Sequence, residues 1–297
     1  MDGILNVLKP PGMTSFDVVS HLRGLLGTRK IGHAGTLDPL AVGVLPVCIG
    51  RATKAIEFMM DKDKVYRAEL TLGIMTDTQD SSGKVLSACE VNCTDEEIDK
   101  AVRSFTGKYM QLPPMYSALK VNGKRLYELA REGTQIERRQ REVEIYSSRI
   151  LNINRTDGIR ILLDVHCSKG TYIRTLCADI GERLGCGGHM SFLLRKQAGP
   201  FDIAASYTLE KLAQMKETGR IRDAFSSVEL VFMQLGRFTL DEQTEKRFMN
   251  GLPITVPYTT GAENELIRVY GSNNEFIALG SILPGTGKKQ LRAKKLL

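Results

Sequence analysis

The sequence lacks the long apolar segment that a membrane-spanning helix requires. Crossing a bilayer takes about 18 or more consecutive apolar residues, and no stretch of the 297 residues reaches that length. The N-terminus, MDGILNVLKPPG, also lacks the basic, apolar and small-residue regions of a secretory signal peptide. These absences predict a cytoplasmic protein that does not act in a membrane.

Paired cysteines are absent as well. None of the six cysteines belongs to a C-x-x-C pair, so in a reducing compartment we expect free thiols packed as small hydrophobic side chains. Soft metal ligands do gather between His166 and His189, but their spacing matches no standard zinc knuckle. The sequence therefore predicts neither a disulfide framework nor a metal site.

Familiar nucleotide-binding and hydrolase signatures are missing too. The 28 glycines form neither a P-loop nor a G-x-G-x-x-G dinucleotide loop. No G-x-S-x-G nucleophile elbow is present, and the four histidines show no spacing that suggests a catalytic triad. These absences argue against the P-loop, dinucleotide-binding and serine-hydrolase classes.

What the chain does contain is an ordinary globular composition with an excess of basic residues. Hydrophobic residues make up 42% and charged residues 25%, which is typical of a folded protein, and the length fits one or two domains. Lys and Arg number 41 against 34 Asp and Glu, which gives a formal net charge of +7. This charge favours an acidic partner such as nucleic acid.

Strand and helix patterns are interspersed along the first two thirds of the chain without a regular βαβ order. Thr14 with Asp17, and Thr94 with Glu97, fit capping boxes that begin helices, and Asp157-Gly158 is a hairpin turn signal. This order favours an α+β fold with a mixed or antiparallel sheet. We expect strands at 3–8, 44–49, 65–72, 143–154 and 159–167, helices at 14–26, 53–60, 94–105 and 171–184, and an irregular loop at 31–43.

The C-terminal part of the chain has a different character. Short β-like runs such as LIRVY and FIALG are separated by glycine, and the chain ends in the basic segment GKKQLRAKKLL. We expect a small all-β domain here. Its basic end is either a solvated terminus or a set of phosphate contacts.

Asp38 stands in the segment GHAGTLDPLA, for which two interpretations remain open. Because Asp38 precedes Pro39 and an apolar run, its carboxylate could cap a helix whose first residue is proline. Alternatively, a glycine-containing loop displays the carboxylate as a nucleophile or base, with His33 five residues before it. Spacing alone does not decide between the two.

Tyr66 and Arg174 also allow two interpretations each. Alternation places Tyr66 on the same strand face as Ala68 and Leu70, so it is either a core residue or an aromatic at the edge of a cleft that stacks on a base. Arg174 follows a glycine-containing junction between a strand and a helix. It is either solvated or buried beside a carboxylate, whose pKa it would then lower.

Four segments in a fixed order resemble the bacterial tRNA pseudouridine-55 synthases of the TruB family: KPPGMTS at 9–15, GHAGTLDPLAVGVLP at 32–46, KVYR at 64–67 and CSKGTYIRT at 167–175. The resemblance implies the pseudouridine synthase fold, with an α+β catalytic domain at 1–230 built on a mixed, mainly antiparallel sheet. It further implies a small all-β PUA-like RNA-binding domain at 236–297.

The implied activity is isomerisation of uridine 55 in the T loop of tRNA to pseudouridine, with base flipping and with no metal or organic cofactor. In this family pattern Asp38 matches the catalytic nucleophile or base, and Arg174 matches the arginine that keeps it ionised. Tyr66 matches the tyrosine that stacks on the flipped uracil. The remaining matches are His33, which inserts into the T loop, Tyr172, at the pocket floor, and Lys9, which supports the aspartate loop.

The resemblance also implies a partner, which is tRNA bound through its T stem-loop by a monomer that needs no guide RNA. One alternative is a tRNA-binding or tRNA-folding protein on the same scaffold without turnover, in which Asp38 is only a helix cap. Another is a synthase that depends on a guide RNA. Formation of product from tRNA alone distinguishes the first hypothesis from both alternatives.

Overall fold

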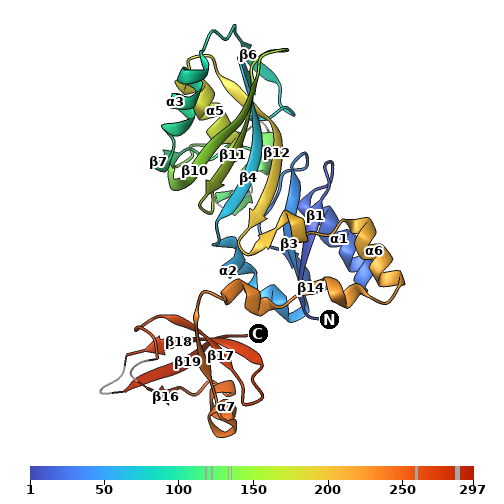
Figure 1. Ribbon diagram of the computed structural model, residues 1–297, viewed down its shortest axis with the longest axis vertical. Coiled ribbons are helices and arrows are strands. Elements are labelled where there is room, and N and C mark those ends of the chain that lie inside the picture. The colour runs from blue at the N-terminus through green and yellow to red at the C-terminus, as the bar shows by residue number, and fades with distance from the viewer. Residues whose placement is uncertain (118, 122, 133, 135, 258–259, 285–287) are drawn as a thin grey trace.

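One mixed sheet of ten strands organises the larger part of the protein (Figure 1). The structure is a computed structural model that describes residues 1–297 except 118, 122, 133, 135, 258–259 and 285–287. The main path of the sheet is β14-β1-β3-β12-β4-β11-β10-β7, with β13 paired to β12 and β2 paired to β3. The strands are β1 (Gly3–Lys9), β2 (Ile31–His33), β3 (Val42–Ile49), β4 (Lys64–Leu72), β7 (Gly107–Gln111), β10 (Arg141–Asn154), β11 (Arg160–Cys167), β12 (Gly188–Ala198), β13 (Phe201–Asp202) and β14 (Phe225–Ser226).

Every pair in this sheet is antiparallel except β3 with β12, which is parallel. The expectation of a mixed, mainly antiparallel sheet is therefore confirmed. The parallel contact is short, since it joins only Leu194 to Val42 and Arg195 to Gly43. It forms the seam between the two halves of the sheet.

Each half of the sheet has its own hydrophobic core. Helices α3 (Asp95–Arg103) and α5 (Ile173–Arg183) pack on β4, β10 and β11 around residues such as Leu70, Ile161 and Ile180. Helices α1 (Ser15–Leu26) and α6 (Leu209–Glu217) pack on β1 and β3. Strand β4 alternates buried and half-buried residues along its length, as its period-two pattern predicts.

The local signals for helix ends are confirmed. Thr14 and Asp17 form a capping box at the start of α1, and Gly27 ends that helix with φ of 64° in the left-handed region. Thr94 and Glu97 form the same box at α3. The hairpin expected around Asp157-Gly158 is the antiparallel pair β10–β11.

Three local expectations were wrong or incomplete. The segment 31–43, expected to be irregular throughout, begins with the short strand β2, and the helix expected at 53–60 is a 3-10 turn, η1 (Gly50–Ala55), followed by α2 (Ile56–Met60). Strand β12 was not predicted, although it joins the two halves of the sheet. Register shifts at Met190/Phe192 and Arg195/Gln197 break its alternation, which removes the period-two signal.

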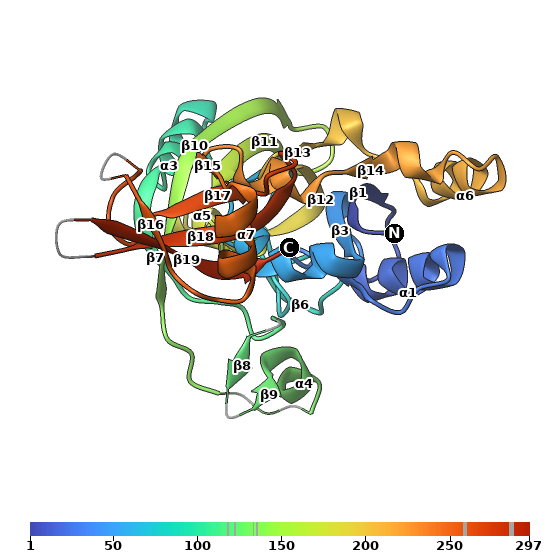
Figure 2. The same ribbon diagram turned by 90° about the horizontal axis from the view of Figure 1, so that it is seen from below.

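Smaller elements connect these parts. In Figure 2, the segment with α4 extends away from the sheet. No helix among the described residues is long and apolar enough to cross a membrane. The connecting elements are β5 (Ile74–Thr76), β6 (Val85–Ala88), β8 (Lys120–Val121), β9 (Lys124–Arg125), α4 (Leu126–Arg131), η2 (Ile203–Ala205), η3 (Ile221–Ala224) and η4 (Val228–Phe232).

The C-terminal region forms a second sheet with its own core (Figure 1). Its strand order is β15-β17-β18-β19-β16, which confirms the expected β domain. One helix, α7, was not predicted, and the basic chain end is not a loose terminus but strand β19. The elements are β15 (Gly236–Thr239), α7 (Glu242–Met249), β16 (Ile254–Val256), β17 (Leu266–Tyr270), β18 (Phe276–Leu283) and β19 (Lys289–Leu296).

Aromatic contacts and a hydrogen bond attach this second sheet to the rest of the protein. The ring of Phe232 in η4 lies 5.3 Å from the ring of Phe58 and 6.0 Å from that of Phe276, measured between centroids. Lys54 Nζ donates to the carbonyl of Leu296 at 2.9 Å. These contacts fix the C-terminal region against α2 and η4.

The seam between β3 and β12 supplies a stability prediction. Gly43 has φ of 113°, and a Cβ at this position would overlap the backbone of Arg195. We expect Gly43→Ala to lower the free energy of unfolding by about 3 kcal/mol, because it adds both steric overlap and backbone strain. Gly24→Ala is the matched control, since this glycine lies in α1 with open space around it, and alanine there raises stability by up to about 1 kcal/mol. Urea denaturation measures the free energy of unfolding of both variants. An equal change in the two would contradict the close packing at the seam.

Candidate active site

Asp38 lies on a loop that is anchored to the start of α1. Ser15 Oγ accepts a hydrogen bond from the backbone N–H of Leu37 at 2.9 Å and donates to the carbonyl of Leu37 at 3.2 Å. Pro39 O accepts from the N–H of Gly12 at 2.9 Å and from Lys9 Nζ at 3.0 Å. The residues on both sides of Asp38 are therefore held by a chain segment more than twenty positions earlier.

No helix begins after Pro39. The N–H of Ala41 donates to the carbonyl of Asp38 at 3.1 Å, which closes a turn, and β3 starts at Val42. The helix-cap interpretation of Asp38 is therefore wrong. The competing interpretation, a carboxylate displayed on a loop, agrees with the structure.

Arg174 binds the Asp38 carboxylate with two nitrogens. Its Nε lies 3.0 Å from Oδ2 and its Nη2 lies 3.4 Å from Oδ1. The Arg174 side chain is only 6% exposed, so water screens the pair weakly. The interpretation of Arg174 as a buried partner of a carboxylate is confirmed.

A second carboxylate, Asp80, shares the same guanidinium. Arg174 Nη1 lies 3.3 Å from Asp80 Oδ2 and also donates to Thr78 O at 3.2 Å, while Nη2 donates to Tyr116 O at 2.8 Å. Asp80 itself accepts hydrogen bonds from Thr78 Oγ1 and from the backbone of Ser82. The sequence analysis missed Asp80, because the segment TDTQDSSG has the composition of any polar turn.

Burial raises the pKa of the Asp38 carboxyl above its usual value, and the positive charges of Arg174 and Lys9 counteract that rise. The negative charge of Asp80 adds to it. The sequence analysis expected only the lowering by Arg174; the structure adds the larger opposing effect of desolvation. The Asp38 side chain remains 38% exposed, so a ligand can reach it.

Tyr66 lies on β4 and is 9% exposed. It belongs to the hydrophobic core that also contains Leu37 and Ala41 of the Asp38 loop. Burial raises the pKa of its hydroxyl, and the charge of Asp38 contributes to the rise, so the two side chains are electrostatic neighbours. Tyr66 is thus a core residue, in the same hydrophobic cluster as two residues of the Asp38 loop.

Tyr172 immediately precedes α5. Gln111, which is buried at the end of β7, holds the tyrosine backbone by accepting from its N–H at 2.8 Å and donating to its carbonyl at 3.1 Å. Burial raises the pKa of the Tyr172 hydroxyl. Gln111 is a second residue that the sequence analysis missed, since a single glutamine at a strand end carries no pattern.

Lys9 is fully buried and donates from Nζ to the carbonyls of Pro10, Met13 and Pro39 at 2.8, 2.6 and 3.0 Å. Burial lowers its pKa to about 8.

His33 lies at the end of β2, where burial lowers the pKa of its ring and Nδ1 has no hydrogen-bond partner. Among the described residues, no hydrogen bond joins His33 to Asp38 or Arg174.

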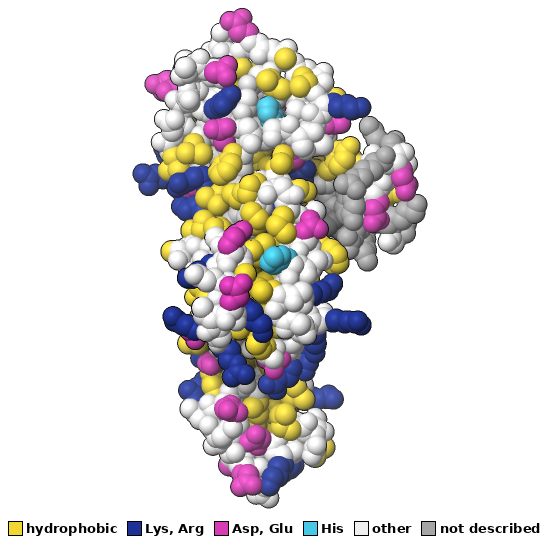
Figure 3. All heavy atoms as spheres, turned by 90° about the vertical axis from the view of Figure 1, so that its right-hand side faces the viewer, with side chains coloured by type: hydrophobic (Ala, Val, Ile, Leu, Met, Phe, Trp, Pro, Cys, Tyr) yellow, Lys and Arg dark blue, Asp and Glu magenta, His cyan; other side chains and the backbone are white. Residues whose placement is uncertain are grey.

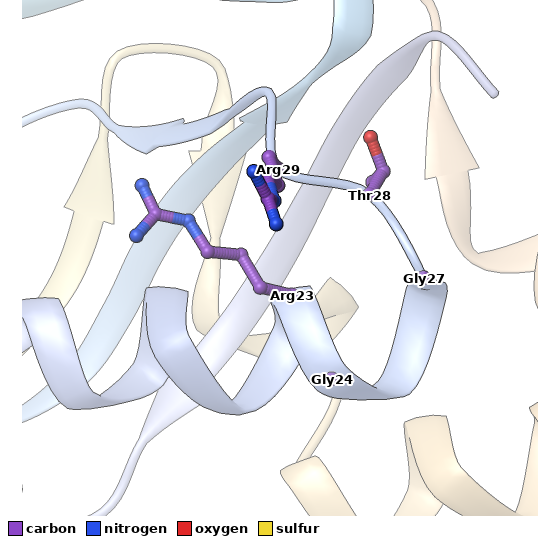
Figure 4. A pocket seen from close by; sticks show the side chains of 5 residues that line it. All are labelled: Arg23, Gly24, Gly27, Thr28 and Arg29. Atoms are coloured by element: carbon purple, nitrogen blue, oxygen red, sulfur yellow. The ribbon is translucent and has the colours of Figure 1, made fainter.

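A separate pocket of about 650 Å³ lies at the C-terminal end of α1 (Figure 4). Arg23, Gly24, Gly27, Thr28 and Arg29 line it, and none of them touches the Asp38–Arg174 pair. Within the part of the chain that the structure describes, no group of three or more His, Cys, Asp or Glu side chains is placed to hold a metal ion.

The shared guanidinium predicts a measurable coupling between the two carboxylates. We expect Asp80→Asn to lower the pKa of Asp38, because the substitution removes a nearby negative charge and a competitor for Arg174. A carboxyl-detected ¹³C NMR titration of wild type and variant measures the shift. Asp164→Asn is the control, because Asp164 pairs with Arg67 and Lys196 instead. An unchanged or higher Asp38 pKa in Asp80→Asn would contradict the network.

The chain matches a known protein family over most of its length. Residues 23–173 match the family model described as "TruB family pseudouridylate synthase (N terminal domain)", and residues 174–232 match "tRNA pseudouridylate synthase B C-terminal domain". The chain is 48% identical to "tRNA pseudouridine synthase B" of Alkaliphilus oremlandii, over 95% of this chain and 93% of that protein. It is also 48% identical to the protein of the same name from Clostridium novyi, over the full length of both.

Solved structures give the same relationship at greater distance. A chain in "Crystal Structure of a Cbf5-Nop10-Gar1 Complex" matches with a TM-score of 0.77 and 28% identity, over 99% of this chain and 84% of that one. A chain in "Structure of H/ACA RNP bound to a substrate RNA containing 2'-deoxyuridine" matches with a TM-score of 0.76 and 26% identity, with the same coverage. The chain belongs to the TruB family of pseudouridylate synthases.

Proposed function

We propose that this chain is a tRNA pseudouridine synthase that converts uridine 55 in the T loop to pseudouridine, with Asp38 as its catalytic carboxylate. The observation that carries the proposal is the Asp38–Arg174 pair, in which a loop-borne, partly accessible carboxylate meets a buried guanidinium. Full-length relatives at 48% identity that bear the name tRNA pseudouridine synthase B support the same reaction.

The chemistry explains why such a pair is needed. The reaction breaks the bond between N1 of uracil and C1′ of ribose, turns the base, and forms a bond from C5 to the same carbon. The C5 proton leaves and N1 gains a proton, so the isomerisation is balanced without a cofactor. Attack on the base, attack on the sugar and abstraction of a sugar proton all require an ionised carboxylate. Arg174 supplies the opposing charge that keeps Asp38 ionised when RNA displaces water from the site.

The aromatic residues suit the handling of a flipped base. A uridine in a folded loop must leave its stack before the reaction, at a cost of a few kcal/mol. Tyr66, which belongs to the same hydrophobic core as Leu37 and Ala41 of the Asp38 loop, is our candidate for stacking on the uracil. Tyr172, just before α5, is proposed to shape the part of the site that receives the flipped uracil. His33, at the end of β2, is proposed to fill the gap that the flipped base leaves in the T loop. Lys9 is proposed to support the loop from behind.

We propose that tRNA contacts two domains, a catalytic one at 1–230 and an RNA-binding one at 236–297. Separate sheets and separate cores support this division. On β19, the side chains of Arg292 and Lys294 are exposed, which suits phosphate contacts. Figure 3 shows further Lys and Arg side chains spread along one face of the molecule.

We further propose that the enzyme works in the cytoplasm as a monomer without a guide RNA. The relatives that match it from end to end are named as tRNA-modifying enzymes. The chains of the Cbf5 and H/ACA complexes are more distant, at 26–28% identity. Every residue of the site described above comes from this one chain.

Removing the charge of Asp38 tests the proposal directly. We expect wild type to form pseudouridine at the T-loop position of an unmodified tRNA transcript, and Asp38→Asn to form none while it binds tRNA with nearly the same Kd. Binding survives because it is spread over many phosphate and shape contacts. Nucleotide-resolved mapping of pseudouridine and a titration of tRNA binding give the two readings.

Asp223→Asn is the matched control, because Asp223 is an exposed acid whose ion-pair partner among the described residues is nearby Arg220. It should behave as wild type. Wild-type turnover by Asp38→Asn would disprove the role of Asp38. Folded wild type that binds tRNA without forming product would favour the tRNA-folding alternative or a missing partner.

The second domain generates a salt-dependence prediction. Each phosphate contact contributes about 0.9 to the slope of log affinity against log salt. We expect the double variant Arg292→Ala/Lys294→Ala to reduce this slope for full-length tRNA by about 2, and to leave binding of an isolated T stem-loop unchanged. Lys246→Ala is the control, since Lys246 lies on α7 of the same domain, away from β19 in the sequence, and forms an ion pair with Glu242. A flat salt dependence for wild type would refute the electrostatic part of the proposal.

A further inference from the structure

Arg195 is the largest side chain that is almost completely buried in the described part of the protein. It lies on β12 with 1% of its surface exposed. No carboxylate among the described residues forms an ion pair with it. Burying a cation without a counterion costs free energy unless other groups accept hydrogen bonds from its donors. The groups that accept from Arg195 therefore show which part of the chain it holds in place.

Those partners are backbone carbonyls on both sides of the Asp38 loop. Arg195 Nε donates to Val44 O at 2.7 Å, Nη2 donates to Gly35 O at 3.0 Å, and Nη1 lies 3.5 Å from Thr36 O. Gly35 and Thr36 lead directly into Asp38, and Val44 belongs to the strand that follows it. One guanidinium therefore holds the entry and the exit of the loop together.

The same side chain also lies beside Tyr66. Arg195 and Tyr66 are directly opposite each other in the antiparallel β4–β12 pair, so their side chains emerge on the same face of the sheet. The positive charge of Arg195 opposes the rise in the pKa of the Tyr66 hydroxyl that burial causes. Arg195 thus connects the aspartate loop to the aromatic residue next to it.

The surrounding sequence leaves room for this arrangement. Gly43 pairs with Arg195 across the parallel seam, where a Cβ would overlap the Arg195 backbone. A Cβ on Gly35 would lie 3.4 Å from Arg195 Nη1. The close approach of β3 and β12 therefore depends on glycine at position 43, whereas the distance at Gly35 is an ordinary contact and glycine is favoured there by its φ of 91°.

We propose that Arg195 is a positioning residue for the isomerisation, which sets the Asp38 loop and the Tyr66 hydroxyl in their reactive arrangement. The assignment rests on the proposed function. Arg195 acts through these two groups and not by touching the substrate. A role in global stability alone, or in tRNA binding, is the alternative that the experiment must separate from it.

Arg195→Lys is the test variant. Lysine keeps the charge and much of the length but lacks the planar fork that reaches several carbonyls at once. We expect the single-turnover rate of pseudouridine formation at saturating enzyme to fall by about 10- to 100-fold, since small displacements of reacting groups have effects of this size. The Kd for tRNA should stay within about twofold of the wild-type value, since base-independent contacts dominate binding.

Lys196→Met is the matched control. Lys196 is the next residue on β12, is partly exposed and pairs with Asp164. Its variant should keep the wild-type rate. Thermal unfolding of all variants shows that each is folded at the assay temperature, so a slower reaction cannot be assigned to unfolded protein.

A double-variant comparison tests the connection to Tyr66. If Arg195 acts partly through the tyrosine hydroxyl, Tyr66→Phe and Arg195→Lys together should slow the reaction by less than the product of their separate effects. A purely structural role would give no such coupling. Independent, multiplicative effects would overturn the part of the assignment that involves Tyr66.

The other outcomes are equally decisive. A folded Arg195→Lys variant with the wild-type rate, or one whose loss lies entirely in Kd, overturns the assignment while the proposed function stands. Absence of product from wild type overturns the proposed function and the assignment with it.

If Arg195→Lys does not fold, Ser15→Ala removes a second, independent anchor of the same loop. An unchanged rate of pseudouridine formation in that variant overturns loop positioning.

Discussion

The contact between Arg174 and the carboxylates of Asp38 and Asp80 is the interaction on which the site depends. A guanidinium offers donors in a fixed plane, so two acids can share it only if three chain segments converge at set angles. The segments come from the loop before β3, the polar turn after β5 and the first turn of α5. Placing these three segments together is what the two-part sheet accomplishes.

The seam between β3 and β12 makes that convergence possible. Strand β12 pairs with β4 on one side and with β3 on the other. It therefore joins the half of the sheet that α5 covers to the half that bears the Asp38 loop. Lys9 and Ser15 then tie the loop to the opposite side, at the start of α1. The loop has little regular structure of its own, yet its backbone groups are held from two directions.

Sequence alone predicted the parts whose signals are local. The capping boxes at Thr14 and Thr94 and the hairpin at Asp157-Gly158 depend on contacts within a few residues, and all three are present. The nature of the Asp38 segment could not be decided in that way, because Ser15 and Lys9 determine it from far along the chain. Asp80 and β12 were missed for related reasons: a polar turn looks the same whether or not an arginine faces it, and bulges erase the alternation of a strand. The family resemblance, not the spacing of residues, pointed to Asp38 and Arg174 together.

The aromatic contacts of Phe232 with Phe58 and Phe276 have a consequence for the substrates that the protein accepts. Because they attach the C-terminal sheet to the rest of the protein, they set the distance between Asp38 and the outer face of β19. An RNA that touches both places must present its target base and its distant phosphates at that one span. In the proposed function, this span relates the position of the target base to that of the phosphates that β19 would contact, so the length of the stem between them bears on how a full tRNA fits the protein.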